Sequence, residues 1–124
     1  ALHCFCIHLG LFERSRRKQM AMIEEYIKRH VPHKEPLVVA GDFNDWRGKE
    51  SKRFEQDLGL STSVIDKRGL AAKTFPAAFP ALSLDRLYVK GLTIRSASVC
   101  RHRPWSSLSD HAGILAQVVE SDAP

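Results

Sequence analysis

The sequence has too few cysteines for a disulfide framework and no long hydrophobic run. Its three cysteines, Cys4, Cys6 and Cys100, cannot all pair within one chain. Cys4 and Cys6 are two residues apart on one side of an expected strand, where they are poorly placed to bond each other. This cysteine usage favours a reducing compartment such as the cytoplasm. No stretch approaches the length of a membrane span. The first residues also lack the basic and apolar segments of a signal peptide.

Internal repeats, low-complexity tracts and domain linkers are also absent. The 124 residues suit one domain or part of one, and residues 1–4 read as a strand already under way, so we expect the chain to begin inside a domain. A content of 44% hydrophobic and 27% charged residues is ordinary for a soluble α/β protein. The formal net charge of +5 favours polyanionic partners such as nucleic acids, phosphorylated metabolites or anionic lipid surfaces. Many proteins without such partners are equally basic.

The hydrophobic pattern predicts strands and helices in a layered α/β order. Residues 2–9 are apolar on both faces, which is typical of a strand covered on both sides. We expect further strands at 37–40, 84–89, 92–100 and 113–119, and helices at 13–29 and 49–58. Lys90 and Gly91 suit a hairpin turn between two of these strands. Residues 59–83 are punctuated by Gly and Pro, so surface loops with one short strand at most are expected there.

The helix at 13–29 begins with cations. These are Arg14, Arg16, Arg17 and Lys18. Cations at a helix N-terminus oppose the helix dipole and cost up to about 1 kcal/mol each when exposed. They are therefore a mild indication of an anionic partner, with a solvated charged face as the alternative for each residue.

Four short segments place polar or ionisable residues beside a hydrophobic strand. These segments are residues 6–9, 41–45, 83–86 and 109–111. In layered α/β proteins, strand ends and their loops can project side chains into a common cleft. The segments supply carboxylates, imidazoles and a carboxamide, which can bind Mg²⁺ or Mn²⁺ and move protons near neutral pH.

The same segments resemble the endonuclease/exonuclease/phosphatase superfamily, whose fold is shared with pancreatic deoxyribonuclease. Residues 39–44 are similar to its strand followed by Gly-Asp-Phe-Asn, and residues 109–111 to its closing Ser-Asp-His motif. Residues 84–89 resemble its strand that begins with an aspartate, and His8-Leu9 resembles the His-Leu pair that ends an earlier strand. Four elements in the family's order and spacing are much more specific than one tetrapeptide.

The resemblance implies a layered α-β-β-α sandwich in which residues 1–124 form the C-terminal portion of a single domain. The N-terminal portion, which normally supplies a metal-binding glutamate, would be absent, and Glu13, Glu24 and Glu25 do not stand in that context. We therefore expect about one sheet plus helices, weak metal binding and little activity from the isolated chain. We also expect self-association through the uncovered face of the sheet.

The resemblance also implies roles for individual residues. Asp42 would position the attacking water and contact the metal, and Asn44 would hold a phosphate oxygen. His111 would act as general base or stabilise the transition state, while Asp85 would accept a hydrogen bond from its other ring nitrogen and set the tautomer. His8 would be a second imidazole at the phosphate and could protonate the leaving oxygen.

The implied reaction is hydrolysis of a phosphodiester or phosphomonoester by in-line attack of water, with Mg²⁺ or Mn²⁺ neutralising phosphoryl charge. Asp110 would lie at or beside this metal. Nucleic acid, a phospholipid head group and small phosphodiesters remain open as substrates. A non-catalytic module that keeps the phosphate pocket without turnover is the alternative from another functional class.

Two segments near the motifs combine arginine with tryptophan. Arg101, Arg103 and Trp105 precede the Ser-Asp-His motif and could clamp or stack on a substrate. The alternative is an exposed loop with Trp105 tucked over the core. Trp46-Arg47, directly after the Gly-Asp-Phe-Asn-Asp run, has the same two interpretations.

Structural alternatives exist for the single residues. Asp42 suits a turn or helix cap, and a lone histidine such as His111 is more often structural than catalytic. Asp85 is harder to dismiss, because a carboxylate inside an apolar strand needs a partner. Cys4 and Cys6 are expected as small core residues. A zinc site of these cysteines with His8 does not fit the usual ligand spacing.

Overall fold

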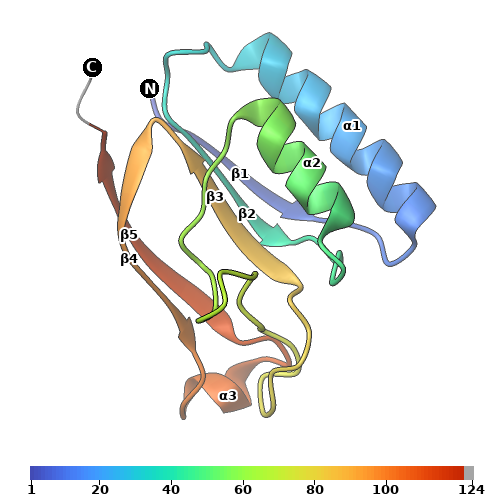
Figure 1. Ribbon diagram of the computed structural model, residues 1–124, viewed down its shortest axis with the longest axis vertical. Coiled ribbons are helices and arrows are strands. Elements are labelled where there is room, and N and C mark those ends of the chain that lie inside the picture. Colours follow the sequence, from blue (N-terminus) through green and yellow to red (C-terminus); the bar gives the residue numbers. More distant parts are fainter. Residues whose placement is uncertain (122–124) are drawn as a thin grey trace.

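The computed structural model describes residues 1–121 and forms two sheets with helices. The elements run β1 (His3–His8), α1 (Glu13–His30), β2 (Leu37–Asp42), α2 (Lys49–Leu58), β3 (Asp85–Lys90), β4 (Leu92–Cys100), α3 (Trp105–Leu108) and β5 (Gly113–Glu120). One sheet has the strand order β1-β2-β3 and the other pairs β4 with β5. Helices α1 and α2 lie on one side of the three-stranded sheet, and the β4–β5 pair lies on its other side (Figure 1). This arrangement confirms the predicted class, part of a layered α/β sandwich.

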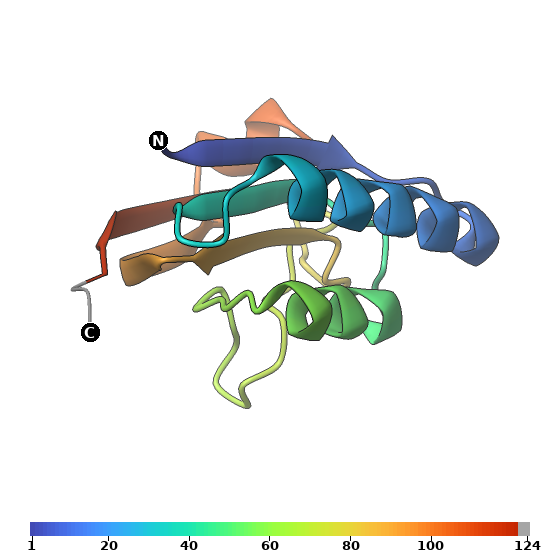
Figure 2. The ribbon, with the colours of Figure 1, turned by 90° about the horizontal axis from the view of Figure 1, so that it is seen from above.

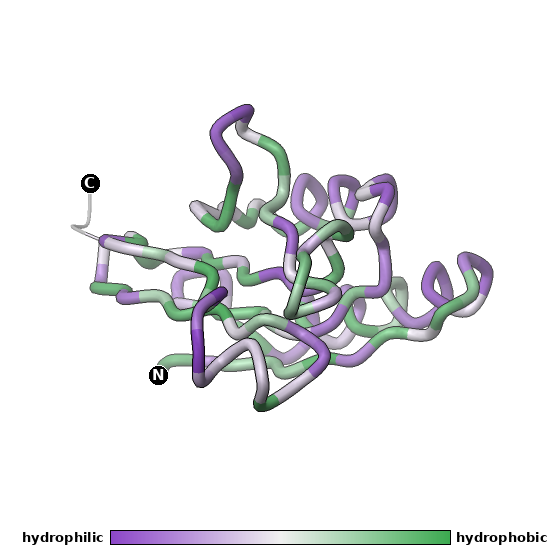
Figure 3. Tube along the Cα trace, turned by 90° about the horizontal axis from the view of Figure 1, so that it is seen from below, coloured by the Kyte–Doolittle hydropathy of each residue, from purple (hydrophilic) through white to green (hydrophobic). Residues whose placement is uncertain are grey.

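The core lies between the two long helices and the three-stranded sheet. Alternation in β2 turns Leu37 and Val39 toward the helices, where both are fully buried. Phe43 packs edge-on against Phe54 of α2 and Tyr88 of β3, with ring centroids 6.0 and 5.6 Å apart. Full burial of such a side chain stabilises the fold by roughly 1.5–3 kcal/mol. Hydrophobic residues alternate with hydrophilic ones along the chain (Figure 3).

The expectation that β1 is covered on both faces is wrong for the described chain. Phe5 and Ile7 pack against the helix-side core, but Cys4 and Cys6 are exposed on the opposite face. The second sheet lies against β3 rather than β1, so β1 keeps one bare face. The two cysteines are therefore not core residues here, and all three cysteines are free.

The predicted hairpin at Lys90-Gly91 is also wrong. Strand β3 pairs antiparallel with β2, and β4 pairs antiparallel with β5, so the chain changes sheets between β3 and β4. Gly91 has a φ of +72° and a Cβ there would lie 3.3 Å from Pro36 Cα. The turn residue was recognised correctly, but a tight turn does not determine whether the flanking strands pair.

Residues 59–83 contain no named strand. Isolated bridges instead join Ser61 to Val89, Ile65 to Ala71 and Phe75 to Leu82. Figure 2 shows the beginning of this connection beside α2. Across residues 1–121, no helix combines the length and apolarity needed to cross a membrane.

Candidate functional site

Strand register places three of the expected site residues in one row. His8 is the register partner of Asp42 in the parallel β1–β2 ladder, and Asp42 is the partner of Asp85 in the antiparallel β2–β3 ladder. The row runs across one end of the sheet, where β1 and β2 finish and β3 begins. Residues separated by more than 70 positions in the sequence therefore meet at one edge.

Gly41 allows β1 and β2 to approach closely beside this row. Its φ is +143°, and a Cβ at this position would lie 1.9 Å from the carbonyl oxygen of Ile7. That distance is far inside van der Waals contact, so only glycine fits. The glycine of the Gly-Asp-Phe-Asn run thus lets the two strands come close enough for His8 and Asp42 to pair in register.

Asn44 closes a tight turn immediately after β2. Its φ is +49°, in a left-handed region that asparagine tolerates better than most residues. The Asn44 backbone N–H donates to Asp42 Oδ1 at 2.9 Å, and its side-chain Nδ2 donates to the Leu9 carbonyl at 2.6 Å. The motif therefore ties the ends of β1 and β2 together and orients the Asp42 carboxylate.

His111 reaches the row from the loop before β5. The Ala112 N–H donates to the Thr74 carbonyl, and the Ala77 N–H donates to the Asp110 carbonyl, both at 2.7 Å. These bonds dock the Ser-Asp-His segment onto residues 74–77. The His111 ring also lies 4.9 Å from the Phe75 ring, centroid to centroid.

His111 and Asp85 form the expected carboxylate–histidine pair. His111 Nδ1 lies 2.7 Å from Asp85 Oδ2, and the same oxygen accepts a hydrogen bond from Thr74 Oγ1 at 2.6 Å. With Nδ1 engaged in this way, His111 Nε2 points toward Asp42 Oδ2, 3.7 Å away. His8 Nε2 lies 3.6 Å from that same Asp42 oxygen. Two imidazole nitrogens therefore face one carboxylate oxygen.

The surroundings of His111 raise its pKa above the ordinary value. Partial burial favours the neutral ring and acts to lower the pKa. The hydrogen bond and charge of Asp85 outweigh it, with further contributions from the charges of Asp42 and Asp110. The site therefore favours an imidazolium more than water does.

The row opens into a cleft of about 680 Å³. Its lining includes His8, Asp42, Asn44 and His111 as polar groups, with Phe75 and Leu84 among the apolar ones. His8 is largely exposed, with 79% of its side-chain surface accessible, whereas Asp42 is 17% accessible. A few converging polar groups on an apolar wall are typical of small-molecule and phosphate sites.

The chemistry of this cluster is compatible with a divalent cation. Single ligand atoms of Asp42, Asp85 and His111 all lie within 4.8 Å of one another. Asp85 Oδ2, however, already accepts two hydrogen bonds, whereas Asp42 Oδ2 has the two imidazole nitrogens at the longer distances of 3.6 and 3.7 Å. Mg²⁺ is commonly held by one or two carboxylates with water and phosphate oxygens completing its shell. The donor set fits such a cation.

Four other expected residues lie outside this cluster. Asp110 is exposed, and its carboxylate is not among the clustered ligand atoms. Arg101, Arg103 and Trp105 are exposed and do not line the cleft. Trp46, in contrast, borders the cleft and is about half exposed. The roles of these residues in metal or substrate binding stay predictions.

Three supporting hydrogen bonds were not expected from the sequence. Thr74 is fully buried and holds Asp85. Asp45 is also buried, accepting from the Ser51 N–H at 2.8 Å, while Arg86 Nη2 donates to the Asp45 carbonyl at 2.5 Å. Asp45 thus anchors the first turn of α2 behind the motif. Arg86 could have been found from the sequence, because it follows Asp85 in the motif at the start of β3. Thr74 could not, because it lies in an irregular loop without a recognisable pattern.

Comparisons with known proteins agree with this geometry. A model of the Endonuclease/Exonuclease/phosphatase family matches residues 5–111. The uncharacterised protein YbhP of Escherichia coli K12 is 42% identical over 118 residues, which cover 95% of this chain and 46% of YbhP. The chain therefore spans about half the length of that curated relative.

Solved structures show the same fold at lower identity. A functionally unknown conserved protein from Enterococcus faecalis matches with a TM-score of 0.75 and 23% identity, over 95% of this chain and 50% of that one. The human Nocturnin catalytic domain, solved with bound sulfate, matches with a TM-score of 0.69 and 22% identity, over 95% and 46% of the two chains. With its motifs and fold in agreement with the match over residues 5–111, this chain belongs to the endonuclease/exonuclease/phosphatase family.

Proposed function

We propose that the protein carrying this chain is a divalent-metal-dependent phosphoesterase that hydrolyses a phosphodiester or phosphomonoester by in-line attack of water. The observation that carries the proposal is the His111–Asp85 pair facing Asp42 across the cleft, at 2.7 and 3.7 Å. Family membership supports it, because members are generally hydrolytic and typically use divalent metals.

The geometry supplies the elements of proton transfer. Asp85 accepts the Nδ1–H of His111, so the neutral ring presents an unprotonated Nε2 to the cleft. That nitrogen can take a proton from a water held by Asp42. In its cationic form the same ring can donate to a phosphoryl oxygen and offset the charge that develops there. His8 Nε2, which lies 3.6 Å from Asp42 Oδ2, would protonate the leaving oxygen.

Asp42 would hold the divalent cation, and Asn44 would contact a phosphate oxygen. When bound, the cation would neutralise phosphoryl charge as a Lewis acid. The described residues supply few further carboxylates at the cleft, which fits a chain that spans half the length of its relatives. Further metal ligands would come from sequence outside these 124 residues.

The test is turnover of bis(4-nitrophenyl) phosphate with Mg²⁺ by the natural full-length protein. We expect His111→Ala to reduce kcat by about 10²-fold or more while inorganic phosphate still binds. His33→Ala, an exposed histidine between α1 and β2, is the matched control and should keep the wild-type rate. A wild-type protein that binds phosphate but turns over no phosphoester with any divalent cation would instead be the non-catalytic module.

A further inference from the structure

A groove of about 750 Å³ opens next to the catalytic cleft, between α2, β3 and the connection that follows α2. Trp46 and Leu82 line both hollows, so the groove and the cleft meet at the Trp46 side chain. A substrate whose reacting phosphate lies at His111 can therefore extend past Trp46 into the groove.

The groove is strongly cationic. Its ionisable lining consists of the cations Arg47, Lys52, Arg68, Lys73 and Arg86 and the carboxylates Glu55 and Asp66, beside the phenol of Tyr88. One carboxylate is already occupied, since Asp66 accepts hydrogen bonds from the N–H groups of Arg68 and Leu70 within its own turn. Within residues 1–121, Arg47, Lys52 and Lys73 form no ion pair shorter than 4.0 Å. The excess charge suits an anionic ligand.

A buried arginine adds a second indication. Arg86 is more than nine-tenths buried, and its Nη2 donates to the carbonyls of Asp45 and Ser83. Arg86 lines the groove, and its buried Nε has no hydrogen-bond partner among the described residues. An unsatisfied buried donor costs free energy unless a ligand or water accepts from it.

Trp46 offers a flat surface at the junction. The residue is 52% exposed, and the Arg47 guanidinium lies over its ring, 4.8 Å from the centroid. An exposed aromatic ring beside unpaired cations is the combination that single-stranded nucleic-acid sites use, because a base stacks on the ring while phosphates meet the cations.

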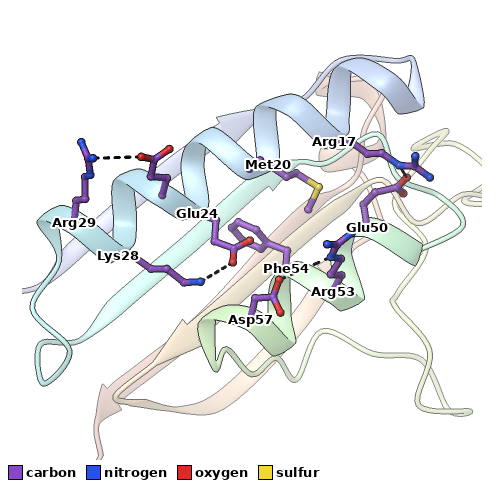
Figure 4. Close-up of a pocket in the computed structure, with 11 residues that line it drawn as sticks. Arg17, Met20, Glu24, Lys28, Arg29, Glu50, Arg53, Phe54 and Asp57 are labelled. Carbon is purple, nitrogen blue, oxygen red and sulfur yellow. Dashed lines mark hydrogen bonds and ion pairs between the residues drawn. The ribbon is translucent and has the colours of Figure 1, made fainter.

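Another large hollow has a different character. It lies between α1 and α2 over Met20 and Phe54, and it carries four cationic and four acidic side chains that largely pair with one another (Figure 4). Examples are Glu24 with Lys28 at 2.9 Å and Arg17 with Glu50 at 3.5 Å. Because its charges cancel, and it shares no lining residue with the catalytic cleft, it offers nothing specific to a polyanion.

We propose that the groove beside Trp46 is a nucleotide subsite, in which a base stacks on Trp46 and a neighbouring phosphate lies among Arg47, Lys52 and Lys73. The proposal rests on the phosphoesterase function proposed above and makes a nucleotide phosphodiester its substrate class. A lipid head group fits less well. An inositol phosphate has no flat ring for Trp46, and a choline cation would be repelled by the lining charges.

The experiment measures binding of two single-stranded hexamers of equal charge, hexathymidylate and its abasic counterpart, to the full-length protein in EDTA. Trp46→Leu should weaken hexathymidylate binding by about tenfold and leave abasic binding unchanged. Trp46→Phe should restore most of the loss. Lys52→Gln should weaken both hexamers equally. Arg53→Gln changes the next residue of α2, which lines the hollow against α1 instead of the groove, and should weaken neither.

An equal effect of Trp46→Leu on both hexamers, or no effect on either, overturns the subsite. Tighter binding to phosphatidylinositol-phosphate vesicles than to hexathymidylate, lost on Trp46→Leu, would overturn it in favour of a lipid. Failure of the proposed function is distinguishable, because a protein that shows base-dependent binding but no turnover of bis(4-nitrophenyl) phosphate keeps the subsite and loses the hydrolase.

Discussion

Gly41 and Ile7 face each other across the parallel ladder so closely that a Cβ on residue 41 would lie 1.9 Å from the Ile7 carbonyl oxygen. This contact sits one residue before the His8–Asp42 pair. The close approach of β1 and β2 at the candidate site therefore requires glycine at position 41.

Gly41→Ala should destabilise the protein severely, because the backbones of β1 and β2 must separate to admit the methyl group. We expect a loss of about 3 kcal/mol or more in the free energy of unfolding, measured by urea denaturation, together with loss of turnover. Gly59→Ala is the matched control. Gly59 also has a positive φ, +66°, but nothing lies within 4 Å of its Cβ position, so only the backbone cost of about 1 kcal/mol is expected. Equal losses at the two positions would contradict the steric account.

Thr74→Val should reduce turnover without unfolding the protein. The substitution keeps the shape of a fully buried side chain but removes the donor to Asp85 Oδ2 at 2.6 Å. We expect kcat to fall by about tenfold, since a hydrogen bond to a charged group contributes roughly 1.5–3 kcal/mol. Thr74→Ser, which retains the hydroxyl, should recover most of the rate. Loss of activity in the serine variant as well would indicate a packing role instead.

The pKa of His111, followed by NMR in chelator-treated protein, should lie above its ordinary value of 6.5 and fall in Asp85→Asn. Because the folded-state pKa is raised, this group stabilises the protein fully below about pH 6.5. The contribution is lost as the pH rises through the raised value. Asp85→Asn should therefore flatten the pH dependence of unfolding in that range. An unchanged titration in the variant would show that the pair is not electrostatically coupled.

The isolated 124-residue chain should self-associate and show little turnover. Cys4 and Cys6 are exposed on a bare sheet face, and Leu115 on β5 is 66% exposed. Sedimentation velocity under reducing conditions should show concentration-dependent association that Cys6→Lys diminishes, since a charge disfavours burial of that face. A monomer at all concentrations would contradict this expectation.

The sequence predicted the elements well, because their hydrophobic periods are local properties. The helix at 13–29 and the strands after residue 84 were placed within one or two residues, and the gathering of His8, Asp42, Asp85 and His111 followed from motif resemblance. Which strands pair with each other was harder to predict. Gly91 signals a turn in the sequence, but only tertiary packing sends β4 into a second sheet.

The exposure of one face of β1 and the hydrogen bond from Thr74 to Asp85 were also not predictable, because both depend on tertiary contacts. An apolar pattern shows which faces can be buried, whereas the bare face of Cys4 and Cys6 depends on which elements lie nearby. Thr74 reaches Asp85 from an irregular loop 11 residues earlier, at a spacing that no helix or strand period marks. The sequence alone left open whether Trp46 contacts a substrate. Its position between two hollows depends on the tertiary fold.

The most direct measurement is a double-substitution cycle on phosphodiester turnover, with Asp85→Asn and His111→Ala made singly and together in the full-length protein. Since the carboxylate acts through the imidazole, the double variant should be no slower than His111→Ala alone. Independent, additive losses, or wild-type turnover in either single variant, would contradict a reaction that runs through this pair.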